Sequence, residues 1–95
     1  MTLARVVAFD GVDDERIAEM QRNMRDSDPP EGLRPTELIV LHDSDAGKAL
    51  AIVFFANEED YRAGDAILST MPAGDTPGTR TSVAKYDVAI RMAPS

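Results

Sequence analysis

The sequence predicts an α+β fold in which a four-stranded antiparallel sheet has two helices on one face. Three observations support this prediction. Four stretches rich in apolar and β-branched residues end at turn-forming residues, two stretches with helix signals lie between them, and the order along the chain is β-α-β-β-α-β. Right-handed crossovers between strands in this order produce a ferredoxin-like sandwich.

The length and composition fit one such domain. The chain has 95 residues, of which 43% are hydrophobic, so we expect one domain over residues 1–95. Its net charge of −7 disfavours nucleic-acid binding. The absence of Cys excludes disulfides, thiolate catalysis and cysteine-ligated metal centres. No apolar run approaches the ~20 residues of a membrane span and no signal peptide is visible, so we expect a soluble cytoplasmic protein.

The first part of the chain predicts one strand and one helix. Residues 3–9 mix Val, Ala and Phe and stop at the turn signal Asp10-Gly11, which is typical of a strand. From Asp13, apolar residues recur at helical spacing, with acids near the N-terminal end and Arg near the C-terminal end. The two prolines within residues 26–32 end this helix.

The central hairpin predicts a partner. Residues 36–43 and 48–55 form two strands joined by a turn at 44–47. Neither strand alternates polar and apolar residues, so both faces of the sheet are apolar, and the helices can cover only one. The other face is then an exposed apolar patch, which is typical of an interface, and we expect a homodimer with sheets packed face to face. In the second strand of this hairpin, residues 48–55, side chains alternate between the two faces. One face has Leu50, Ile52 and Phe54, and the other has Ala49, Ala51, Val53 and Phe55.

A second helix and a last strand complete the predicted fold. Asn57 offers an N-cap side chain, acids follow it, and the helix runs to about Met71. A loop over residues 72–80, rich in Gly and Pro, could gate a pocket. The last strand spans residues 81–92.

This pattern resembles a known family. The apolar strand, Asp/Gly turn, second apolar strand and acidic helix start over residues 41–60, with the closing strand at 81–88, are similar to the antibiotic-biosynthesis-monooxygenase-like (ABM-like) group of dimeric α/β-barrel proteins. The resemblance implies a homodimeric barrel with a pocket between helices and sheet in each subunit. Some members oxidise phenolic or quinol-like aromatics with oxygen and no bound cofactor. Others degrade haem with a second-helix His, a Trp and a first-strand Asn, which this chain lacks, so we do not expect haem degradation.

Three residues are candidates for catalysis. His42 is the only imidazole and stands beside Asp43 at a strand end, where it could accept a proton at a pocket mouth or be a surface histidine of the hairpin. Tyr61 and Tyr86 could bind or polarise an oxygenated aromatic, or could pack in the core. The candidate walls of the substrate pocket are Met20, Met24, Phe54 and Leu68.

The remaining charged residues predict less chemistry. Arg5 and Arg91 could anchor an anionic substrate or lie at solvated strand edges. The acidic trios at residues 13–15 and 58–60 do not converge on one ion, because successive helical side chains lie about 100° apart, so they are helix-start signals. Asp43 and Asp45 could contribute oxygens to a cation, but two acids do not complete a coordination shell, and Asp is common in turns, so we interpret both as turn residues. We expect neither a metal nor a cofactor.

Two functions remain open. The first is binding of a small oxygenated aromatic, such as a phenol or quinol, by a protein similar to the cofactor-independent monooxygenases. The protein would help to deprotonate the phenol and hold its anion in a dry pocket for reaction with oxygen. The alternative is a non-catalytic homodimer with a packed interior that binds a ligand or another protein.

Overall fold

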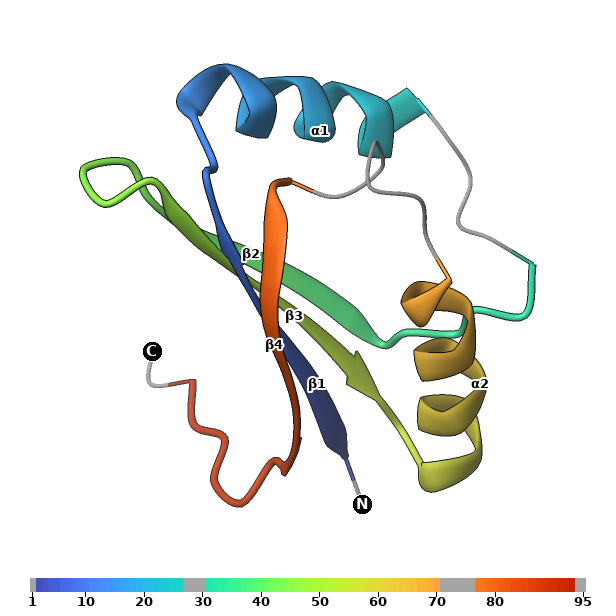
Figure 1. The fold of residues 1–95 in the computed structure, drawn as a ribbon. Coiled ribbons are helices and arrows are strands. Elements are labelled where there is room, and N and C mark those ends of the chain that lie inside the picture. Colours follow the sequence, from blue (N-terminus) through green and yellow to red (C-terminus); the bar gives the residue numbers. More distant parts are fainter. Residues whose placement is uncertain (1, 27–30, 71–76, 94–95) are drawn as a thin grey trace.

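The computed structural model describes residues 2–26, 31–70 and 77–93. Within these residues the elements follow the predicted order β-α-β-β-α-β (Figure 1). They are β1 (Leu3–Asp10), α1 (Asp14–Asp26), β2 (Glu37–Asp43), β3 (Lys48–Phe55), α2 (Glu58–Ser69) and β4 (Thr79–Asp87). All neighbouring strands are antiparallel, in the sheet order β2-β3-β1-β4, which confirms the ferredoxin-like α+β fold class.

Most predicted boundaries agree with the structure, and β4 differs most. β3 has the predicted bounds at both ends. β4 begins at Thr79 and ends at Asp87, so the prediction of a strand reaching residue 92 is wrong. The reason is the length of the neighbouring strand, because Asp87 pairs with Leu3, the first residue of β1. One further hydrogen bond follows, from the Val88 amide to the Thr2 carbonyl oxygen at 2.9 Å. The predicted helix end at Met71 and residues 72–76 of the loop lie outside the described residues.

The core lies between the sheet and α2, with a second cluster near the start of α1. Phe55 and Tyr61 meet edge to face in the first cluster, with ring centroids 5.6 Å apart and planes at 75°. Gly64 on α2 lets the helix approach this cluster, since a Cβ there would lie 2.4 Å from the Phe55 ring. The first cluster comprises Leu3, Val53, Phe55 and Tyr61, and the second comprises Val7, Phe9, Val12 and Ala49.

The helix α1 is attached more loosely than α2. None of its residues is buried, although its Ile17 packs against the second cluster. Figure 1 shows α1 at one end of the sheet and α2 along the other. The face that carries the helices is therefore only partly covered, and Leu38 and Val83 remain exposed on it.

No helix of the described residues lies over the opposite face of the sheet, which we call the bare sheet face. The strand register assigns Leu50, Ile52 and Phe54 to this face, as the alternation in the sequence predicts. All four strands contribute small or apolar side chains to it. They are Ala4, Val6, Ala8, Ile39, Leu41, Leu50, Ile52, Phe54, Ala84 and Tyr86. No helix among the described residues is long and apolar enough to cross a membrane.

Candidate functional site

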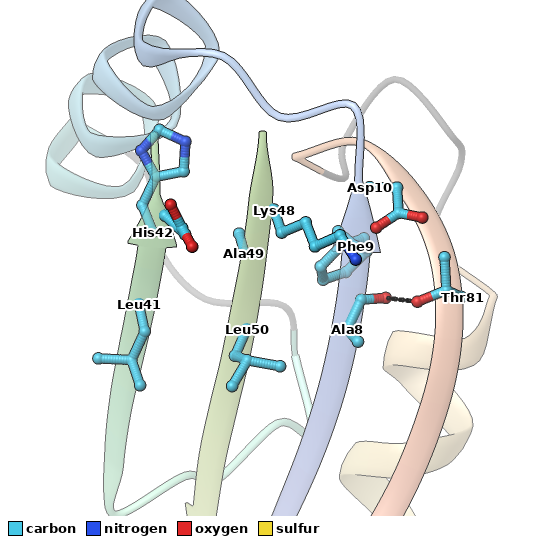
Figure 2. A pocket seen from close by; sticks show the side chains of 10 residues that line it. Ala8, Phe9, Asp10, Leu41, His42, Lys48, Ala49, Leu50 and Thr81 are labelled. Carbon is cyan, nitrogen blue, oxygen red and sulfur yellow. Dashed lines mark hydrogen bonds between the residues drawn. The ribbon is translucent and has the colours of Figure 1, made fainter. Parts of the chain in front are cut away.

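A hollow of about 350 Å³ opens at one end of the bare sheet face, where β2 ends and β3 begins (Figure 2). Its apolar part consists of Leu41, Leu50 and Ala8, which stand side by side in the register of three adjacent strands. A hollow with this lining suits an apolar or aromatic group. The residues around it are Ala8, Phe9, Asp10, Leu41, His42, Asp43, Lys48, Ala49, Leu50 and Thr81.

A row of charged residues forms the end of the hollow. Lys48 is paired in register with Asp10 on one side and with Asp43 on the other, so a basic residue stands between two acidic ones on adjacent strands. Cross-strand neighbours of opposite charge stabilise a sheet. Asp43 also accepts a hydrogen bond from the Ala46 amide at 3.1 Å, which shapes the hairpin turn. The hollow thus combines an apolar floor with a polar end wall that can contact an oxygen substituent.

His42 lies at the edge of this hollow, but its ring points to the other side of the sheet, toward the start of α1. Its Nε2 is 3.2 Å from the carbonyl oxygen of Val12, and its Nδ1 is 3.6 Å from a carboxylate oxygen of Asp14. The register places His42 opposite Ala49, on the face that carries the helices. The imidazole therefore joins β2 to the segment that begins α1, and it must leave Val12 to act on a molecule in the hollow.

The two tyrosines lie on opposite faces of the sheet. Tyr61 is buried in the core, and the Lys85 ammonium lies 4.9 Å from its ring centroid. Burial raises the pKa of the Tyr61 phenol. Tyr86 is 57% exposed on the bare sheet face, in register with Ala4. Core packing is thus confirmed for Tyr61, and the structure does not bring His42, Tyr61 and Tyr86 together.

The four predicted pocket walls do not line one pocket either. Met20 and Met24 lie on α1, where Met24 is exposed, while Leu68 packs against the cluster under α2. Phe54 lies on the bare sheet face, so the sheet separates it from the other three. The sequence contains the signal for this separation. Leu50 and Phe54 are four residues apart on one strand, so their side chains lie on the same face of the sheet, and this is the face without helices.

The expectation of a solvated strand edge is wrong for Arg5. Its side chain is almost fully buried, since β1 is a central strand and the residue faces α2. Arg5 Nε donates a hydrogen bond to Asp65 Oδ1 at 2.8 Å, and its Nη2 donates to Ser69 Oγ at 3.3 Å. Arg91 also departs from a strand edge. It lies beyond β4, pairs with Glu37 and stacks over the Phe54 ring, 5.6 Å from its centroid.

Asp65, Ser69 and Arg80 were not predicted from the sequence, and they lie at the C-terminal end of α2. Arg80 Nη2 donates to the carbonyl oxygen of Leu68 at 3.2 Å. The spacing of Asp65 and Ser69 at i and i+4 places both on one helix face, which was an available signal. For Arg80 the sequence contains no such signal, because its position depends on the register of β4.

The acidic helix starts are confirmed as helix signals. Asn57 is the N-cap of α2, and its side chain accepts a hydrogen bond from the Asp60 amide at 2.8 Å. Lys85 Nζ contacts both carboxylate oxygens of Glu58 at 2.6 and 2.8 Å, and this hydrogen bonding lowers the pKa of Glu58. Among the described residues, no group of three or more His, Asp or Glu side chains is arranged to hold a metal ion.

Comparison with known proteins does not assign the chain to a family. No model of a known protein family matches it, and no curated protein matches it. What the chain can bind must therefore follow from its surface, its hollow and its charged groups.

Proposed function

We propose that this protein is a homodimeric small-molecule-binding domain whose subunits associate through the bare sheet face. One observation supports the dimer: side chains from all four strands form an apolar surface that no helix of the described residues covers. Contiguous exposed apolar patches are typical of interaction sites. Burial of apolar surface contributes about 25 cal/mol per Å², so a second copy that covers this face stabilises both subunits.

The distribution of charge supports self-association. Asp10, Lys48 and Asp43 stand at one end of the bare sheet face, and Glu37 and Arg91 stand at the other. Between these ends the aligned side chains of β1 and β3 are apolar. An apolar centre with a polar rim is the usual anatomy of a stable interface. Two such faces packed against each other form the dimeric α/β barrel.

A pair of leucines provides the test of the dimer. Leu50 is 38% exposed on the bare sheet face, and Leu38 is 43% exposed on the opposite face. We expect Leu50→Lys to be a monomer by light scattering at micromolar concentration, while the wild type and Leu38→Lys are dimers. A monomeric wild type would contradict the proposal, and so would dissociation of both variants.

The ligand that the hollow fits best is an aromatic molecule with an oxygen substituent, of the phenol or quinol type. Because the hollow opens at one end of the face that we propose as the dimer interface, the ligand would lie at the edge of that interface. There Leu41, Leu50 and Ala8 would contact the ring, and the charged end of the hollow would contact the oxygen. We expect a saturable rise in melting temperature with hydroquinones or polycyclic phenols. Thr81→Phe should abolish the rise by filling the hollow, and Thr79→Phe, on the same strand but outside the hollow, should not. If the melting temperature of the wild type does not rise, the result would favour the alternative function, a non-catalytic dimer with a packed interior.

A second candidate function is oxidation of such a ligand by oxygen without a bound cofactor. The presence of His42 at the edge of the hollow favours it. The His42 ring would first leave the Val12 carbonyl and turn toward the hollow. It would then accept the phenol proton, and the electron-rich phenolate would react with oxygen. We expect oxygen consumption with hydroquinones that falls about 100-fold or more in His42→Gln, the usual size of a general-base effect. If the wild type consumes no oxygen, the result would contradict catalysis, and ligand binding alone would remain as the proposed function.

We propose the cytoplasm as the location, which cell fractionation can test.

A further inference from the structure

Two arginines from the sheet meet the last turn of α2, which has no basic residue of its own. Arg5 Nη2 donates to Ser69 Oγ at 3.3 Å, and Arg80 Nη2 donates to the carbonyl oxygen of Leu68, the preceding residue, at 3.2 Å. Both arginines lie on the face that carries the helices, since Arg80 pairs in register with the buried Phe9. Two guanidinium groups therefore converge on adjacent residues of one helix end.

The charges at this place do not balance. Arg5 has the Asp65 carboxylate as its partner. None of the ion pairs among the described residues includes Arg80. In addition, Arg80 Nε is buried and has no hydrogen-bond partner within the part of the chain that the structure describes. A buried guanidinium N–H without an acceptor is rare in native proteins, because most such donors are satisfied by protein, water or a ligand. Among the described residues, the Arg80 guanidinium thus has neither a carboxylate partner nor an acceptor for its Nε–H.

We infer that Arg80, supported by Arg5 and Ser69, binds the carboxylate group of a small organic molecule. The guanidinium is a planar fork of N–H donors that matches the two oxygens of a carboxylate. Ser69 Oγ accepts from Arg5, so its own hydroxyl hydrogen can be donated to the same anion. The partial negative charge at the C-terminal end of α2 opposes a doubly charged phosphate, and this favours a monoanion.

This site is independent of the hollow and of the function proposed for it. The hollow opens on the bare sheet face, whereas Arg80 and Arg5 face α2 on the other side. A result at one site therefore does not decide the other.

The test follows the Nε–H signals of the arginine side chains in ¹H–¹⁵N spectra of the whole chain. Arg80→Lys identifies the Arg80 signal and retains the positive charge at the helix end. Sodium benzoate and sodium acetate are titrated at constant ionic strength, with chloride as the reference anion and inorganic phosphate as a second arm. We expect a saturable shift of the Arg80 signal with both carboxylates and none with chloride.

A variant series then measures the contribution of Arg80. Arg80→Lys should weaken benzoate binding about tenfold to a hundredfold, as expected for loss of a charge-assisted hydrogen bond. Arg62 is an exposed arginine of α2 that contacts Glu58. Arg62→Lys should leave benzoate binding unchanged. The absence of a saturable shift in the wild type, or equal affinity in Arg80→Lys, would overturn the site. Tighter binding of phosphate than of benzoate would overturn the assignment to a carboxylate.

Discussion

Arg5 places a full positive charge in the central strand of a small sheet, where it is only 3% exposed. Taking a guanidinium out of water is unfavourable unless a counter-charge and hydrogen bonds replace the lost solvation. Asp65 provides the counter-charge, and its own side chain remains 43% exposed. Partial contact with water weakens this pair relative to a fully buried one, but it also lowers the cost of desolvating the carboxylate.

Replacing Asp65 should therefore be more costly than breaking a surface pair. Asp65→Asn leaves Arg5 buried without its counter-charge, and we expect a loss of about 1–3 kcal/mol in the free energy of unfolding. Glu19→Gln, which removes the exposed i,i+3 partner of Arg16, should cost less than about 0.5 kcal/mol. Urea unfolding at neutral pH measures both values. Equal losses in the two variants would show that burial of Arg5 does not matter.

Gly64 is the residue on which close packing of α2 depends. A Cβ at this position would lie 2.4 and 2.5 Å from two carbons of the Phe55 ring, so the ring or the helix must move. We expect Gly64→Ala to destabilise the protein by about 1–3 kcal/mol, the usual cost of overpacking.

The sign of this effect distinguishes packing from helix propensity. Alanine is the better helix former by about 1 kcal/mol, so propensity alone would make Gly64→Ala stabilising. Ala66→Gly, at an exposed position of the same helix, measures the propensity term in this chain. Thermal unfolding of both variants decides between the two effects.

Tyr61 should make the protein less stable in alkaline solution. Burial raises the pKa of its phenol above the ordinary value near 10, so the unfolded chain loses this proton at a lower pH than the folded chain. The stability associated with the neutral phenol is complete below the unfolded pKa and is lost as the pH rises from about 10 toward the folded pKa. Denaturant unfolding across this range should show a steeper loss in the wild type than in Tyr61→Phe. Tyr86→Phe is the control, since it removes a hydroxyl from an exposed ring.

At the scale of elements, the two helices are held in different ways. α2 has an N-cap, a buried face at Tyr61 and Gly64, and an ion pair from Glu58 to β4. α1 begins with the Asp13 side chain, which accepts a hydrogen bond from the Arg16 amide at 2.7 Å, but it buries no residue. Helix stability in proteins comes mainly from packing of an apolar face, so α2 contributes more to the folded state.

The cap of α2 should have a measurable effect. Asn57→Ala removes the side-chain acceptor of the Asp60 amide, and we expect a loss of about 1 kcal/mol in the free energy of unfolding. Asn23→Ala, at an exposed position within α1, should be neutral or slightly stabilising because alanine favours the helix. Chemical denaturation measures both. A smaller loss for Asn57→Ala than for Asn23→Ala would contradict the role of the cap.

At the scale of the whole molecule, the two faces of the sheet differ in what covers them. Its helix-bearing face provides the core of the chain, and its bare face presents Leu41, Leu50 and Tyr86 to solvent. A chain of this length buries a limited share of its surface by itself, so a partner that covers the bare sheet face would have a large effect on stability.

The proposed dimer predicts that stability depends on protein concentration. Association of folded chains stabilises them by mass action, so the melting temperature should rise as the concentration of the wild type is increased. Leu50→Lys should melt at a lower temperature that does not change with concentration, and Leu38→Lys should retain the concentration dependence. Differential scanning calorimetry over a wide concentration range measures this. A melting temperature of the wild type that is independent of concentration would contradict the dimer.

The local pattern of the sequence determined the elements and the two-sided character of the sheet. Turn residues such as Gly47 and caps such as Asn57 act within a few residues of their own position. Alternation along β3 likewise separates Phe54 from Phe55 without reference to any other element. These features were predictable because their causes are local in the chain.

The tertiary structure alone decided which charges are buried and where β4 ends. Arg5 meets Asp65 across 60 residues, and Arg80 reaches Leu68 only through the register of β4 on β1. Likewise, β4 ends at Asp87, which pairs with Leu3, the first residue of β1. Pairings of this kind depend on which distant segments become neighbours in the sheet. A candidate site assembled from such segments, as at Arg80, therefore becomes visible only when the chain is folded.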